Sequence, residues 1–181
     1  MSASEERGHE PVYLRSLEMD DLPKIHQWHN DLHLYEILVG EHGHVSRSAV
    51  EQWLRGKTAF SRNERSWAIC ISESHEHIGN IYLKEIDWVA RHARLSMFIG
   101  DPAHRSKGYG RVAVRLMTEH AFKCLGLLRV HLIVLADNEP AIRAYKKCGF
   151  QTEGRLRRHA YVNGQFRDMQ FMGLCADDKE S

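Results

Sequence analysis

The feature that most constrains this chain is a glycine-rich hexapeptide, Arg-Ser-Lys-Gly-Tyr-Gly at residues 105–110, that leads directly into a helical pattern. A glycine-rich turn at the start of a helix presents unpaired backbone N–H groups and the positive end of the helix dipole, and both attract phosphate. Alone, the hexapeptide is equally compatible with an ordinary turn carrying a solvated basic face, because short glycine motifs often occur by chance. A second pattern, N-x-x-A-x-x-x-Y-x-x-x-G-F, runs from Asn138 to Phe150 after a short strand-like run. Together the two patterns predict an α/β domain with a phosphate-binding loop at a strand-to-helix junction.

Hydrophobic periodicity predicts a single domain over residues 1–181 with the element order β-α-α-β-β-β-α-β-α-β-β. The expected strands are 12–17, 67–71, 78–88, 91–100, 129–135, 150–162 and 165–174, and the expected helices are 19–31, 46–56, 108–125 and 138–148. The segment 34–45 is poorly periodic and predicts a loop. Asn163-Gly164 lies between two alternating apolar runs and predicts a β-hairpin. Residues 1–10 and 176–181 are expected to be flexible tails.

The charge balance and hydropathy exclude several classes of partner. The chain has 25 basic and 24 acidic residues, which gives no reason to expect a nucleic-acid or anionic-membrane partner. No apolar run approaches the roughly 20 residues that a membrane span needs. The first ten residues are polar and acidic, without an apolar segment of the signal-peptide type, so a cytoplasmic location is expected.

Residues that bind metals are present, but their spacing does not predict a metal site. The four cysteines contain no C-x-x-C pair, which favours reduced, buried thiols over disulfides or zinc ligands. His26, His29 and His33 would lie near one face of a helix, either as metal ligands or as a polar face near a substrate cleft. No acidic or cysteine partner stands at ligand spacing, so we predict no metal.

The loop at 105–110, the pattern from Asn138 to Phe150 and the predicted element order resemble the GNAT superfamily of acetyl-CoA-dependent N-acetyltransferases. The resemblance covers the chain from about Val12 to Leu174. It implies the GNAT fold, a mixed, mostly antiparallel sheet flanked by helices. Two branches are most similar, the protein N-terminal and ribosomal-protein acetyltransferases and the bacterial spermidine acetyltransferases. The segments that carry this likeness are 14–18, 138–150, 153–156 and 163–167.

The resemblance implies acetyl-CoA as the co-substrate and no metal. Its pyrophosphate would bind the loop amides, and glycines there would allow close approach. The strand before the loop would hold the pantetheine arm through its backbone, with Gly100 allowing a bulge; its apolar side chains would equally suit a plain core strand. Asn138 would cap its helix and contact the same arm, and Lys146 or Lys147 would meet the 3′-phosphate. The expected acetyl-CoA residues are Phe98, Ile99, Gly100, Arg105, Ser106, Lys107, Gly108, Tyr109, Gly110, Asn138, Ala141 and Lys147.

Two side chains are expected to carry the chemistry. When an amine attacks the thioester in a ternary complex, the departing thiolate needs a proton, and Tyr145 matches the tyrosine that many GNAT enzymes place beside the sulfur. The alternative for Tyr145 is a core tyrosine on an apolar helix face. The incoming ammonium must also lose a proton, and the candidate bases are Glu85, Asp87, His104 and His159. Glu85 is preferred because a strand carboxylate would also attract a cation.

The acceptor is left open between a small-molecule amine, such as a polyamine or an amino sugar, and a protein N-terminus. A polyamine would need gathered carboxylates, but the stretch 34–42 has only Glu36 and Glu41. Tyr82 occupies a position where the resemblance leads us to expect an acid. Two alternatives remain, a CoA-binding regulatory module without catalysis and a transferase of a larger acyl group. A homodimer formed through the edges of the predicted hairpin is also expected.

Overall fold

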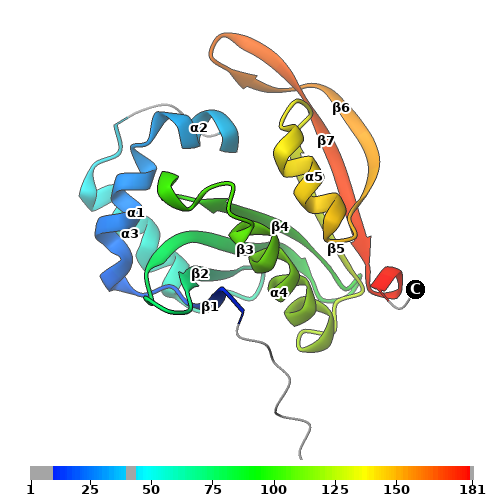
Figure 1. Ribbon diagram of the computed structural model, residues 1–181, viewed down its shortest axis with the longest axis horizontal. Helices are drawn as coiled ribbons and strands as arrows, with labels where there is room; N and C mark the ends of the chain where they lie inside the picture. The colour runs from blue at the N-terminus through cyan, green and yellow to red at the C-terminus, as the bar shows by residue number, and fades with distance from the viewer. Residues whose placement is uncertain (1–9, 40–43, 180–181) are drawn as a thin grey trace, which may run out of the picture.

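The computed structural model describes residues 10–39 and 44–179 as a seven-stranded sheet with helices on both faces (Figure 1). The strand order is β1-β2-β3-β4-β5-β7-β6. Neighbouring strands pair antiparallel, except β4 and β5, which are parallel. The strands are β1 Val12–Ser16, β2 Arg65–Ile71, β3 His77–Asp87, β4 His92–Ile99, β5 Arg129–Leu135, β6 Gln151–Val162 and β7 Gln165–Cys175.

Strand alternation divides the core into two layers. Ala68 and Cys70 face one side of β2 and pack with the helices of the first third of the chain, whereas Ile69 points to the other side and joins the cluster that includes Ala113 and Ile142. These two layers sandwich the sheet. The helices are α1 Leu22–His29, α2 Leu32–Leu38, α3 Arg47–Thr58, α4 Tyr109–Lys123 and α5 Glu139–Lys147, with 3-10 turns η1 Met19–Asp21, η2 Pro102–His104 and η3 Ala176–Lys179. Within the described residues, none of these helices has the length and apolarity to cross a membrane.

Local signals in the sequence explain several element boundaries. The Ser46 side chain accepts a hydrogen bond from the Ala49 N–H and begins α3, and Asn138 does the same for α5 through the N–H of Ala141. Asn163 and Gly164 have φ values of 50° and 78°, so the β6–β7 hairpin has the left-handed turn that Asn-Gly predicts. The predicted hairpin is therefore confirmed.

The parallel pair β4–β5 holds together over a short length only. Three residue pairs join the two strands, the last being Arg94 with His131. Beyond that pair β4 continues to Ile99 with β3 as its one partner strand, and β5 continues to Leu135 with β7 as its one partner strand. The sheet thus opens into a wedge, and the backbone of residues 95–99 presents a free edge inside the fold.

The structure corrects the predicted loop at 34–45, because residues 32–38 form helix α2. Asp31 begins this helix by accepting hydrogen bonds from the N–H groups of His33 and Leu34. Residues 40–43 lie outside the described residues. The predicted first helix is also divided, into η1 and α1, with Pro23 in the first turn of α1.

The expected C-terminal tail at 176–181 differs from the structure over residues 176–179. Ala176–Lys179 forms a 3-10 turn fixed by a hydrogen bond from the Ala176 N–H to Leu128, so these residues are not a loose tail. Residues 1–9 and 180–181 lie outside the described residues. All four cysteines are free thiols, but only Cys70 is buried and Cys124 is exposed, which corrects the expectation of four buried thiols.

Candidate active site

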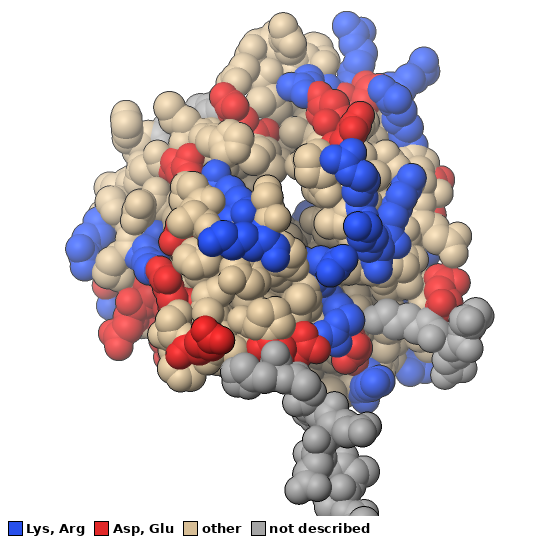
Figure 2. All heavy atoms as spheres, in the orientation of Figure 1, with Lys and Arg blue, Asp and Glu red and all other residues tan. Residues whose placement is uncertain are grey.

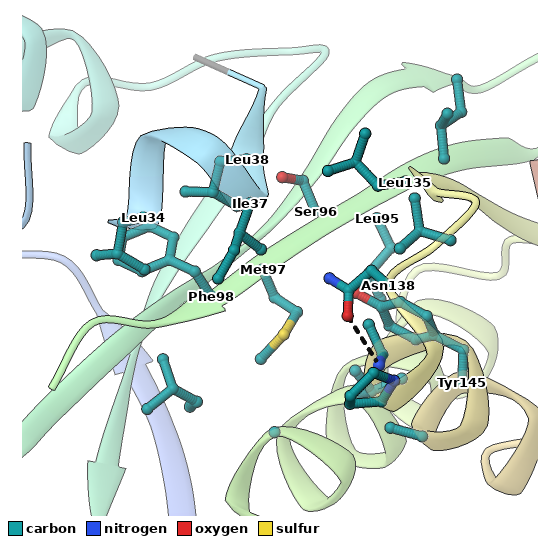
Figure 3. A pocket seen from close by; sticks show the side chains of 18 of the residues that line it. Leu34, Ile37, Leu38, Leu95, Ser96, Met97, Phe98, Leu135, Asn138 and Tyr145 are labelled. Carbon is teal, nitrogen blue, oxygen red and sulfur yellow. Dashed lines mark hydrogen bonds between the residues drawn. The ribbon is translucent and has the colours of Figure 1, made fainter. Parts of the chain in front are cut away.

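The wedge between β4 and β5 contains a cavity of about 580 Å³. The space-filling view shows a hollow in the middle of the molecule with Lys and Arg side chains around it (Figure 2). Figure 3 shows this wall of side chains, with residues of β4 and α2 facing those of α5 across the cavity. The lining includes Leu34, Ile37, Leu38, Val39, Arg94–Ile99, His104–Ser106, Gly108–Arg111, Ile133–Leu135, Asn138, Ala141, Tyr145, His159, Ala160 and Met169.

The glycine loop forms one end of the cavity. Gly108 is the N-cap of α4 with φ +86°, and Ser106 also has a positive φ of 61°. Gly110 lies close to β4, since a Cβ there would be 3.3 Å from Met97 Cε. The N–H groups of residues 106–110 donate to no residue that the structure describes, so they form a backbone nest at the positive end of α4.

The Arg105 side chain is turned away from this nest. Its guanidinium donates to the carbonyls of Ile99 (3.1 Å) and Gly100 (2.8 Å). It also pairs with Asp31 at 3.1 Å. Although burial acts to raise the pKa of Asp31, the hydrogen bonds from Arg105 and from backbone N–H groups lower it. In this structure the Arg105 side chain therefore fastens the loop to the end of β4 and to the start of α2.

Gly100 serves close packing at the end of β4, where its N–H and that of Asp101 both donate to the Ile78 carbonyl. The register shift between β3 and β4 lies at Lys84–Asp87, at the other end of the strands. The Gly100 N–H donates to Ile78 O at 2.8 Å, and a Cβ at this position would lie 2.3 Å from the Trp28 indole ring. Only glycine allows the chain to pass this ring.

Helix α5 supplies two polar groups. Asn138 accepts from the Ala141 N–H through its side-chain oxygen, which leaves its amide nitrogen pointing across the cavity toward β4 (Figure 3). Tyr145 lines the same wall and packs edge-on against Phe150. Its hydroxyl forms no hydrogen bond within the described part of the chain. Burial raises the pKa of Tyr145 to about 12, so the hydroxyl keeps its proton at neutral pH.

Several predicted residues lie away from the cavity. Glu85 has a positive φ at the β3 bulge, is 62% exposed and pairs with Arg94 at 2.5 Å, a hydrogen bond that lowers its pKa. It is therefore poorly placed to take a proton from an acceptor in the cavity, and Asp87 instead accepts backbone N–H groups of its own turn. Among the other candidate bases, His104 and His159 line the cavity. Lys107, Lys147 and Gly100 do not line it.

One wall of the cavity, formed by helix α2 and the β6–β7 hairpin, was not predicted from the sequence. Helix α2 contributes Leu34, Ile37 and Leu38, whose i, i+3, i+4 spacing was a usable helical signal. The β6–β7 hairpin reaches over toward α2 (Figure 1), and Asn163 at its tip donates to Glu36 at 2.8 Å. Of the hairpin residues in the lining, His159 was among the predicted bases, whereas Ala160 and Met169 could not be identified from sequence because only the tertiary fold brings them there.

Of the three histidines considered as metal ligands, His26 and His29 contact neighbouring residues and His33 is exposed. His26 Nε2 lies 3.1 Å from Val45 O, and His29 packs edge-on against Trp53. In the described ranges, one group of three ligand atoms lies close enough together for a metal, from Glu76, Asp101 and His104. The Lys24 ammonium already lies 2.8 Å from Glu76.

Comparison with known proteins decides the family. Residues 12–151 match the family model described as "Acetyltransferase (GNAT) domain". The chain belongs to the GNAT acetyltransferase family. It is 30% identical to the spermidine N(1)-acetyltransferase of Vibrio cholerae over 159 residues, which cover 88% of this chain and 90% of that protein. It is 32% identical to the putative ribosomal N-acetyltransferase YdaF of Bacillus subtilis over 102 residues, 56% of this chain and 55% of that one.

The fold comparison agrees. A crystal structure of spermidine N-acetyltransferase from Vibrio cholerae in complex with CoA and spermine superimposes with a TM-score of 0.86 at 26% identity, covering 94% of this chain and 99% of that chain. The predicted GNAT fold and the two predicted branches are confirmed. The protein is an acetyl-CoA-dependent N-acetyltransferase. The unpaired N–H groups of the loop and the free edge of β4 fit the phosphates and amides of this co-substrate.

We expect Gly108→Val to weaken acetyl-CoA binding by about 10-fold. A β-branched side chain resists φ +86°, so the N–H groups of the nest would turn away from the pyrophosphate. The dissociation constant from isothermal titration calorimetry tests this. Gly126→Val is the matched control, because Gly126 also has a positive φ (+65°) but lies beyond the other end of α4. Equal weakening by both variants would contradict the loop assignment.

Proposed function

We propose that this protein transfers the acetyl group of acetyl-CoA to a primary amine of a small molecule by direct attack within a ternary complex. The observation that carries the proposal is that Tyr145 and the glycine loop open into one cavity at the wedge between β4 and β5. A donor bound along the wedge would then place its thioester beside the tyrosine hydroxyl.

The backbone would hold most of the donor. N–H groups of residues 106–110 would bind the pyrophosphate, and the free edge of β4 over 95–99 would pair with the pantetheine amides. The Asn138 amide nitrogen would add a side-chain donor to the same arm. Such fixed geometry brings donor and acceptor together without further ordering of the protein.

The chemistry needs two proton movements. The amine nitrogen attacks the thioester carbonyl carbon, the C–S bond breaks, and the thiolate takes a proton that we assign to Tyr145. The attacking ammonium must first release a proton to water or to a base. Of the four candidates, His104 and His159 line the cavity. His159 lies on β6 at the end of the cavity next to the hairpin, here called the acceptor end, and its ring makes no hydrogen bond with a described residue.

The acceptor would enter between α2 and the β6–β7 hairpin. The spermidine acetyltransferases among the relatives support a small-molecule amine as acceptor. The described lining contains no Asp or Glu, so it lacks the gathered carboxylates that a polyamine would require. Glu41 lies outside the described residues. The acceptor class is therefore the point to test.

We expect thiol release from acetyl-CoA to depend on one class of amine in a panel of spermidine, lysine, aminoglycosides, amino-sugar nucleotides and N-terminal peptides. Thiol release measured with a chromogenic thiol reagent reports transfer to any of them. Release with an amine and none without it would support the proposal and name the acceptor class. Tight acetyl-CoA binding without release to any amine would overturn it.

The expected cytoplasmic location and homodimer stay predictions. The outer edge of β6 is the end of the sheet and is unpaired within the described chain, so it offers a surface for a second copy. Light scattering of the purified protein would give a dimer mass if the prediction holds, and a monomer mass would contradict it.

A further inference from the structure

Strand β6 contains a wide bulge at the acceptor end of the cavity. Leu156 pairs with Met169 and Ala160 with Arg167, so the three residues 157–159 stand opposite Asp168 alone. Arg158 adopts a positive φ of 53° within this bulge. A non-glycine residue in the left-handed region is held there by its surroundings, which makes the bulge a built feature of the strand.

Asp168 holds the bulge in place through both of its carboxylate oxygens. One of its carboxylate oxygens accepts from the Arg158 N–H at 2.8 Å and the other from Arg155 Nε at 2.8 Å. The backbone N–H of Arg158 and then the Arg155 side chain lower the pKa of Asp168, so the carboxylate stays ionised. Asp168 also interacts electrostatically with Arg157, but among the described residues that line the hollow it is the one carboxylate facing three arginines.

The bulge carries a surplus of positive charge. Arg155, Arg157 and Arg158 surround the single Asp168 in an open hollow. The Arg158 guanidinium lies over the Phe166 ring, 5.3 Å from its centre, which restricts where it can point. Arg157 is exposed and forms no ion pair with any residue in the described ranges.

This hollow adjoins the active-site cavity at His159. His159 lines both of them, and Ala160, the next residue, lines the cavity. The ionisable side chains of the cavity lining other than tyrosine are all basic within the described residues: Arg94, His104, Arg105, Arg111 and His159. Lys and Arg side chains are also prominent beside the central hollow of Figure 2, on the side where Figure 1 places β6, β7 and α5.

We infer that the acceptor amine carries an anionic group, a carboxylate or a phosphate, that Arg157 and Arg158 bind while the amine reaches the acetyl group. This inference rests on the proposed function and names the substrate class of the same site. Guanidinium groups bind such oxyanions through paired N–H donors. A polycation would meet like charges at this place and gain nothing from them.

Matched acceptor pairs test the inference with the whole protein. We would measure KM and kcat for 6-aminohexanoate against hexylamine, and for glucosamine 6-phosphate against glucosamine, with spermidine as the polycation. In each pair the amine is retained and only the anion changes. We expect the carboxylate or the phosphate form to have a KM about 10-fold lower than the partner that lacks the anion. The pair that responds identifies which anion is bound.

The double substitution R157Q and R158Q assigns the effect to the bulge. It should raise KM for the anion-bearing acceptor about 10-fold, leave KM for the partner without the anion and for acetyl-CoA unchanged, and remove the preference. Arg143→Gln is the control, because Arg143 lies on the outer face of α5 paired with Glu139. A preference that survives the double substitution, equal use of both members of each pair, or spermidine as the best acceptor would overturn the inference and leave the proposed function intact. Absence of transfer to every amine would overturn both.

Discussion

Replacing Tyr145 with phenylalanine is expected to lower kcat by about 10²- to 10⁴-fold, the usual range for loss of a general acid. The substitution removes one oxygen and retains the ring that packs on Phe150, so the fold and the donor site stay intact. The dissociation constant of acetyl-CoA should therefore change little. Steady-state kinetics with the acceptor identified in the panel, together with calorimetric titration of acetyl-CoA, measure both quantities.

The elevated pKa of Tyr145 shapes the expected pH behaviour. A pKa of about 12 lies well above a thiol's roughly 8.5, a gap of about 5 kcal/mol for complete proton transfer. Desolvation in the same cavity raises the pKa of the leaving thiol as well and narrows this gap. Because the folded protein raises the tyrosine pKa, the phenol stays protonated as pH increases. Turnover should show no decline due to Tyr145 ionisation up to about pH 10.

Tyr161→Phe provides the matched control for this prediction. Tyr161 is 64% exposed on the β6–β7 hairpin and does not line the cavity. The control should retain the turnover of the unmodified protein. If Tyr145→Phe turned over equally fast, Tyr145 would be a packing residue on the α5 face and not the proton donor.

The second large effect concerns stability: Gly100→Ala should lower the free energy of unfolding by about 2–3 kcal/mol. The added Cβ would lie 2.3 Å from the Trp28 ring, closer than any ordinary contact. Trp28 is only 5% exposed and is packed edge-on against His77 and Phe98, so it has no free space to move into. The end of β4 must shift instead, and Arg105 loses its hold on the Gly100 carbonyl.

Thermal unfolding and acetyl-CoA titration check this prediction. We expect a fall in Tm of roughly 5–10 °C and weaker acetyl-CoA binding. Gly56→Ala is the control, because a Cβ at Gly56, inside α3, meets nothing within 4 Å and should stabilise the helix by about 0.5–1 kcal/mol. A Gly100→Ala protein with unchanged Tm would show that the Trp28 ring can move and that this passage is not tight.

Most of the fold was predictable because its signals are local. The Asn163-Gly164 turn, the Asn138 cap and the alternation of β5 each depend on neighbouring residues, and the structure has all three elements. Helix α2 was not predicted because Gly40 and Gly43, shortly after it, are typical of a loop and obscure the helical spacing of Leu34 and Leu38. Its short length also offers little periodicity from which to detect a helix.

The site was predictable only where the sequence motif carried it. The glycine loop and Tyr145 do line one cavity, but Arg105 faces Asp31, which is 74 residues away in the chain. Glu85 was chosen because it stands on a strand, yet a bulge gives it a positive φ and directs it to Arg94. The basic bulge at 157–159 depends on its pairing with Asp168 on the neighbouring strand, which no single-strand pattern reveals.

The early separation of β4 from β5 has a further consequence. An exposed strand edge normally invites pairing with other chains and so promotes aggregation, but here the unpaired edge at residues 95–99 faces the cavity and not the outside of the sheet. The pantetheine arm can occupy the position of a missing strand. The sheet would then be hydrogen-bonded across its whole width only while acetyl-CoA is bound. The amide protons along this edge should exchange quickly with solvent in the free protein and slowly once acetyl-CoA is bound, which makes deuterium exchange a direct reporter of donor occupancy.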